Sequence, residues 1–316
     1  MFNKKIDPRN LILMLFSILF SLGVLEVALR IVFANNQSFL IHSYLDRPYL
    51  YNTKYWKVWH YPNSESKHRK DCFDVVYKTN SLGLRGAELK IDATYRIALL
   101  GDSFVEGFGV NNNQTFSHLL DSISGKDIEV LNFGTSGGFG TVNELALYEN
   151  FARHFSPDLV ILFYLNYNDV QDNINSISDG LISKSLEFTY PTGTKEEVFA
   201  EIKAQTQPKP TSAIISSFYV TSLANKGLRV FKLFIQSAVN MKADFQSGLT
   251  EIYSTEANDQ LQIGYDIAKK SIERLNKLVS KDSANLVLVN LSDPYQIDKN
   301  WISATEFKYD LKLDPE

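Results

Sequence analysis

The feature that most constrains the fold of this chain is a repeated order of buried strand, polar turn and helix. Three apolar runs predict strands at residues 96–100, 128–132 and 159–165, and each run ends in a polar or glycine-containing turn. Helices are predicted at about 114–124 and 141–155. Strands that alternate with helices form a parallel sheet covered on both faces. The pattern therefore predicts an α/β fold.

The same pattern resumes near the C-terminus. A helix is predicted from about Asn258 to Val279, and an apolar strand follows at 286–291. Residues from about 172 to 253 interrupt the alternation with prolines and polar loops. This stretch predicts an insertion between sheet elements, with one helix at roughly 213–240.

The N-terminus carries a long apolar run that follows several basic residues. The run extends over residues 11–33 and is broken by charge only at Glu26 and Arg30. Such a run predicts either a signal peptide, with a weak cleavage site ending at Ala34, or an uncleaved membrane anchor. The anchor is favoured because the run exceeds a usual signal-peptide core and because Glu26 can pair with Arg30 one helical turn later. The positive-inside rule then places the N-terminus in the cytoplasm and the main domain outside it.

Net charge and cysteine content limit the partners and the kinds of site that this chain can have. The net charge of −4 argues against nucleic acid as a partner, and the single cysteine, Cys72, excludes an intramolecular disulfide and a cysteine-based metal site.

The chain is predicted to have three parts. Residues 1–34 form a cytoplasmic tip and transmembrane anchor, 35–95 an aromatic-rich juxtamembrane segment that packs on the main domain, and 96–316 the α/β domain.

Three of the predicted strand ends carry groups suited to nucleophilic catalysis. Ser103 follows the first strand, Gly137 lies in the turn after the second, and Asn168 follows the third. The carboxyl ends of parallel strands share one edge of a sheet, where α/β folds bind ligands. The amides of Ser103 and Gly137 and the Asn168 side chain are the kinds of donor that stabilise an oxyanion. Alone, Gly-Asp-Ser at 101–103 is more typical of a turn and a helix N-cap, but the coincidence of three turns favours catalysis.

At these turns the sequence resembles the SGNH (GDSL-type) hydrolases. Residues 101–103 match the first block of that family and residues 132–137 resemble the second. Residues 166–169 are similar to the third block, with Asn166 where glycine is usual. The turn-rich stretch 80–86 and the N-terminal anchor also resemble membrane-anchored bacterial members.

The resemblance covers about residues 80–170 and implies a three-layer flavodoxin-like fold. It implies Ser103 as the nucleophile and Gly137 and Asn168 as oxyanion-hole residues. The implied activity is hydrolysis of an ester through an acyl-serine intermediate. The substrate would be an acylated cell-envelope or exported carbohydrate, or a lipid ester. Transfer of the acyl group to another sugar, by an O-acyltransferase, stays open.

Neither a cofactor nor a metal ion is expected. The glycines at 134–140 follow a strand and open a helix but do not fit the Gly-x-Gly-x-x-Gly pattern of a dinucleotide site. Asp102, Asp169 and Asp172 are scattered acids without paired histidines, which does not match a metal site.

The last block of the family, Asp-x-x-His, has no match in this sequence. That block supplies the general base and the aspartate that orients it. The five histidines of the chain are His42, His60, His68, His118 and His154. Two interpretations remain open: the protein continues past Glu316 and carries its base there, or it is a non-catalytic relative that binds glycan or lipid. The first is favoured because the predicted sheet looks unfinished.

Overall fold

The fold is described from a computed structural model. The structure describes residues 8–32, 49–70, 73–207 and 259–292. The chain divides into two compact units, one containing helix α1 and the other containing the α/β domain. His42, the predicted helix at 213–240 and the residues after Ser292 lie outside the described residues.

Helix α1 (Pro8–Val32) carries the N-terminal apolar run. Its stretch of 21 residues from Ile12 to Val32 is long and apolar enough to cross a membrane, and a signal sequence would meet the same criteria. The predicted pairing within this helix is confirmed, since Nε of Arg30 donates to Oε1 of Glu26 at 2.8 Å. The chain therefore has one candidate span among its described helices.

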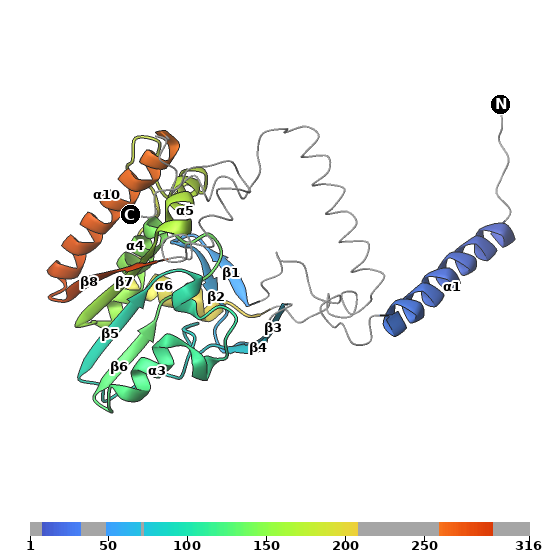
Figure 1. The fold of residues 1–316 in the computed structure, drawn as a ribbon, viewed down its shortest axis with the longest axis horizontal. Coiled ribbons are helices and arrows are strands. Elements are labelled where there is room, and N and C mark those ends of the chain that lie inside the picture. Colours follow the sequence, from blue (N-terminus) through green and yellow to red (C-terminus); the bar gives the residue numbers. More distant parts are fainter. Residues whose placement is uncertain (1–7, 33–48, 71–72, 208–258, 293–316) are drawn as a thin grey trace, which may run out of the picture. The chain divides into compact units, whose positions relative to one another are not determined.

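A parallel four-stranded sheet forms the centre of the α/β domain (Figure 1). The strand order is β6-β5-β7-β8, and every neighbouring pair is parallel. The strands are β5 (Tyr95–Leu100), β6 (Ile128–Asn132), β7 (Leu159–Leu165) and β8 (Asn285–Leu291). Strand β6 lies on one side of β5, and β7 and β8 lie on the other side, which is the flavodoxin-like strand order. The predicted α/β fold with a parallel sheet is confirmed.

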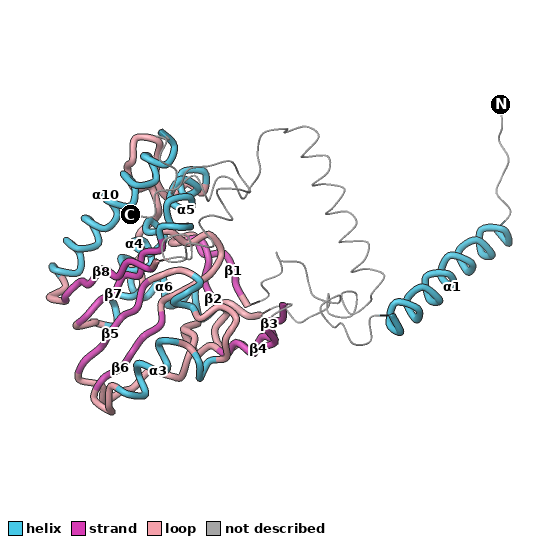
Figure 2. Tube along the Cα trace, in the orientation of Figure 1, coloured by secondary structure: helices cyan, strands magenta, loops and turns pink. Residues whose placement is uncertain are grey.

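Helices cover both faces of this sheet (Figure 2). The larger ones are α3 (Phe116–Ile123), α4 (Thr141–Asn150), α5 (Asn166–Ser178) and α10 (Asp259–Lys281). Successive side chains of a strand point to opposite faces. Ala98 of β5 packs in the large core with α4 and α10, whereas its neighbour Leu99 packs in a smaller cluster with Leu120 of α3. The sheet is thus the middle of three layers.

The aromatic segment before the sheet packs into the same core. Its strands are β1 (Leu50–Thr53), β2 (Lys57–His60), β3 (Glu65–Lys70) and β4 (Phe73–Lys78), which form two small two-stranded sheets. Trp56 and Trp59 are fully buried, and Trp56 stacks on Phe151 with ring centroids 5.6 Å apart. These rings join the first hairpin to the α/β domain, because burying an aromatic side chain removes a large apolar area from water.

The predicted helix at 141–155 ends earlier than expected. Helix α4 stops at Asn150, Phe151 leaves the helical conformation (φ −135°, ψ −60°), and a 3₁₀ helix spans Ala152–Phe155. The ring of Phe151 packs against both Trp56 and Trp59. The break follows from these tertiary contacts, which the helical periodicity of the segment does not reveal.

Two helices occupy the start of the stretch predicted as an insertion. Helix α5 begins directly at Asn166, where a turn is predicted, and α6 spans Lys195–Ala204. Helix α5 is rich in Asn, Asp and Ser, which have weak helix propensity. It packs against α4 and α10, and Val198 and Ile202 of α6 are buried in the main core. Packing therefore forms these helices, and this part of the stretch belongs to the domain.

Candidate active site

Ser103 is the first residue of the short helix α2 (Ser103–Glu106), directly after the turn that ends β5. Asp102 caps this helix, because its Oδ1 accepts a hydrogen bond from the Phe104 amide at 2.9 Å. Ser103 is half-buried, and within the described parts of the chain its hydroxyl forms no hydrogen bond. The helix cap is therefore Asp102, and the candidate nucleophile is the next residue, Ser103.

Asn168 lies next to this turn although it follows a different strand. It belongs to the first turn of α5, and its Nδ2 donates to Oδ2 of Asp102 at 2.8 Å. Strands β5 and β7 flank the point where the strand order reverses, which is where sheets of this order bind ligands. An amide side chain has two N–H donors, so the second remains for another acceptor.

The glycine-rich turn after β6 packs on the backbone of α2. A side chain at Gly134 would lie 2.2 Å from the Glu106 nitrogen, so only glycine allows this approach. Farther along, Gly137 and Gly138 have φ values of +120° and +76°. A Cβ at Gly138 would lie 3.3 Å from Oδ1 of Asp172, which follows Asn168 by one turn of α5. The turns that carry Ser103, Gly137 and Asn168 therefore meet at the carboxyl edge of the sheet.

Four carboxyl groups are gathered beneath these turns. Burial raises the pKa of Asp102, and the Asn168 hydrogen bond opposes that rise. Burial, and then repulsion from neighbouring carboxylates, raises the pKa of Glu144 and of Asp169 well above the ordinary values. Burial also raises the pKa of Asp172 to about 6. Glu144 and Asp169 are fully buried, and burial favours the protonated, uncharged form of both carboxyl groups.

We expect the domain to be more stable in mild acid than at neutral pH. Glu144 and Asp169 have raised pKa values in the folded state. The bound protons stabilise the folded state fully when the pH is below about 4, which is the pKa of these carboxyl groups in the unfolded chain. This stabilisation is lost as the pH rises through their pKa in the folded state. The variant Glu144→Gln should lose less stability as the pH rises from 5 to 8, and the difference from the wild type is at most about 1.4 kcal/mol per pH unit, the limit for one proton.

Urea unfolding of the purified protein, followed by tryptophan fluorescence at both pH values, measures this difference. The matched control is Glu196→Gln, at an exposed position of α6, which should leave the pH dependence unchanged. An unaltered pH dependence in Glu144→Gln would contradict the assignment of a buried proton to this carboxyl group.

The stretch 80–86 folds into a turn held by one asparagine. Oδ1 of Asn80 accepts hydrogen bonds from the amides of Leu82 and Leu84, and its Nδ2 donates to the Ala87 carbonyl at 3.0 Å. The turn presents Arg85 to the end of α2, where its side chain is buried.

Arg85 connects this turn with the end of helix α2 and the residues that follow it. Its guanidinium lies over the Tyr77 ring, 3.7 Å from the ring centroid. It donates to three backbone carbonyls, those of Glu106, Gly107 and Val110. A guanidinium offers five N–H donors in a rigid plane and is suited to such a contact. Arg85 therefore fixes the C-terminal end of α2 and, through it, the position of Ser103.

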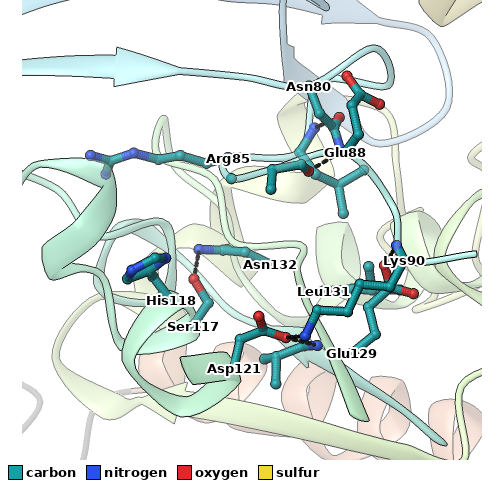
Figure 3. Close-up of a pocket in the computed structure, with 14 residues that line it drawn as sticks. Asn80, Arg85, Glu88, Lys90, Ser117, His118, Asp121, Glu129, Leu131 and Asn132 are labelled. Carbon is teal, nitrogen blue, oxygen red and sulfur yellow. Dashed lines mark hydrogen bonds and ion pairs between the residues drawn. The ribbon is translucent and has the colours of Figure 1, made fainter. Parts of the chain in front are cut away.

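A small pocket of about 80 Å³ lies beside the edge strand β6 (Figure 3). Figure 3 shows Lys90 and Asp121 linked within it, with Nζ of Lys90 2.8 Å from Oδ1 of Asp121. Lys90 also donates to the Ile128 carbonyl, and Asp121 accepts from the Val130 amide. These side chains occupy the edge of β6 with which no strand of the described residues pairs. Ser103 does not line the pocket, which is thus separate from the candidate site.

No described histidine is hydrogen-bonded to Ser103. His68 is enclosed by aromatic rings, His118 is exposed on α3, and His154 packs on Phe199. His60 is buried, and its Nε2 lies 2.8 Å from Oε1 of Glu106, on the same helix as Ser103. Sequence reasoning missed this pair, because residues 46 positions apart give no local signal.

Comparisons with known proteins add little to this geometry. No protein-family model matches the sequence, and no curated protein matches it. LAE5, an alpha/beta hydrolase enzyme from the metagenome of Lake Arreo, Spain, is 12% identical with a TM-score of 0.24, covering 63% of this chain and 79% of its own. A catalytic mutant of Axe2, an acetylxylan esterase from Geobacillus stearothermophilus, is 13% identical with a TM-score of 0.23, covering 63% of this chain and 78% of its own. Both TM-scores are too low to indicate a shared function.

Proposed function

We propose that the protein is a serine ester hydrolase, held in the membrane by α1 with its α/β domain outside the cytoplasm, and that Ser103 is its nucleophile. The observation that carries this proposal is the hydrogen bond between Asn168 and Asp102. It joins the ends of two neighbouring strands, and it holds an amide side chain beside a serine whose hydroxyl is free of hydrogen bonds within the described residues.

In the proposed reaction the Ser103 hydroxyl oxygen attacks the acyl carbonyl and gives its proton to a general base. The tetrahedral oxyanion accepts hydrogen bonds from the amides of Ser103 and Gly137 and from the Asn168 side chain. Collapse breaks the ester bond, and the base returns the proton to the leaving alcohol. Water then hydrolyses the acyl-serine. The described residues place no base at Ser103, so the mechanism requires one from the rest of the protein.

The proposed substrate is an acyl ester of a cell-envelope or exported carbohydrate. This choice rests on the sequence resemblance and on the proposed location of the domain. A lipid ester has the same reacting carbonyl, and a sugar hydroxyl in place of water would make the enzyme an O-acyltransferase. The assay below separates these cases.

The test uses protein produced from the complete gene, incubated with 4-nitrophenyl acetate, an acetylated polysaccharide or a short-chain lipid ester. Released acid is measured, and the Ser103 peptide is examined by mass spectrometry after an acid quench. Acid release with an acyl group on Ser103 supports the proposal. Transfer of the acyl group to an added sugar would indicate the acyltransferase. No release and no acylated serine with any ester would contradict an enzymatic role.

A second candidate function is non-catalytic binding of a glycan or lipid in the same site. It is favoured by one observation, namely that no histidine among the described residues is hydrogen-bonded to Ser103. This candidate predicts that ligand binding survives Ser103→Ala and that no protein carrying the domain turns over an ester.

A further inference from the structure

The loop that carries the Gly137 amide has little stiffness of its own. Gly137 and Gly138 follow one another with φ values of +120° and +76°, and glycine populates many backbone conformations at similar cost. A backbone N–H stabilises an oxyanion well only when it is fixed before the reaction. Something outside these two residues must therefore hold the loop.

The peptide after Gly138 is held by Lys57 and lies beside Asp172. Nζ of Lys57 donates to the Gly138 carbonyl at 3.3 Å, and the carboxyl group of Asp172 lies beside the same residue. Both groups crowd Gly138, since a Cβ there would lie 3.2 Å from Nζ of Lys57 and 3.3 Å from Oδ1 of Asp172. A flip of this peptide would turn the Gly138 carbonyl away from Lys57 and break this hydrogen bond.

Lys57 is itself held in an unusual conformation. Its φ of +91° lies in a region that side-chain-bearing residues rarely adopt, and such backbone strain persists where the surroundings enforce it. Its Nζ also lies 2.6 Å from Oδ2 of Asp179, the residue that caps the C-terminal end of α5. One lysine from β2 thus connects the glycine loop with α5, the helix that carries Asn168.

We infer that Lys57 is a positioning residue that restrains the loop of the Gly137 amide for oxyanion binding by holding the Gly138–Phe139 peptide. The inference rests on the proposed ester hydrolase function. Lys57 acts on the loop and not on the substrate, so its loss should lower the rate of the chemical step and leave substrate binding nearly unchanged.

The test compares Lys57→Met, which keeps the aliphatic stem but removes the charge and the donors, with Lys57→Arg, which keeps both. The control is Lys54→Met, in the preceding turn, where the side chain is exposed. Each variant of the complete protein is assayed for kcat and KM with 4-nitrophenyl acetate. Amide hydrogen exchange is measured by NMR at Gly137, Gly138 and Phe139.

We expect Lys57→Met to lower kcat about 10- to 100-fold, with KM within about twofold, because small displacements of catalytic donors have effects of this size. Exchange should accelerate at the three loop amides only, Lys57→Arg should restore most of kcat, and Lys54→Met should match the wild type. Unchanged kcat, or unchanged loop exchange, in Lys57→Met would overturn the inference. If the wild type turns over no ester, the proposed function has failed, and the exchange rates still decide whether Lys57 holds the loop.

Discussion

The variant Ser103→Ala is expected to lose ester turnover, with kcat lower by at least about 10³-fold, while the domain remains folded. Removal of a serine nucleophile leaves only the residual effect of the oxyanion donors and of substrate binding. The Ser103 hydroxyl forms no hydrogen bond within the described residues, and Asp102, not Ser103, caps α2. The free energy of unfolding should therefore change by less than about 0.5 kcal/mol.

The measurement is kcat for acid release by protein from the complete gene, with urea unfolding of the same samples. Ser122→Ala is the matched control, because Ser122 is an exposed serine on α3 and should change neither quantity. Turnover retained by Ser103→Ala would refute the nucleophile assignment. Loss of turnover together with loss of folding would be resolved with Ser103→Cys, which keeps a nucleophilic side chain of similar size.

The variant Arg85→Met is expected to destabilise the domain by about 3 kcal/mol. Arg85 is buried, and its removal leaves the carbonyls of Glu106 and Val110 without their donor, whereas the Gly107 carbonyl keeps the Val110 amide. Each buried carbonyl without a partner costs about 1–3 kcal/mol, and part of that cost is relieved when water enters. Arg85→Lys should recover less than half of the loss, because an ammonium group cannot reach three carbonyls in one plane.

Urea unfolding followed by tryptophan fluorescence measures this effect, since Trp56 and Trp59 are buried in the main core. The control is Arg153→Met, which removes a partly exposed ion pair with Asp282 and should cost about 1 kcal/mol or less. An Arg85→Met variant that is no less stable than Arg153→Met would show that the stretch 80–86 does not hold the end of α2.

The sequence alone determined the features that depend on neighbouring residues. The apolar run of α1 and the pairing of Glu26 with Arg30 follow from composition and helical spacing. The strands β5, β6 and β7 follow from apolar runs bounded by turn residues. Parallel pairing then requires that the turns carrying Ser103 and Asn168 meet at one edge, because parallel strands end on the same side.

Only the tertiary structure decided the features that depend on distant partners. The end of α4 at Asn150 is imposed by the rings around Phe151, and α5 forms because it packs against α4 and α10. The contact of Lys57 with Gly138 spans 81 positions. Side chains that meet over such separations leave no periodic pattern and no turn signal. Their meeting is set by how the layers pack, whereas propensity and periodicity act over only a few residues along the chain.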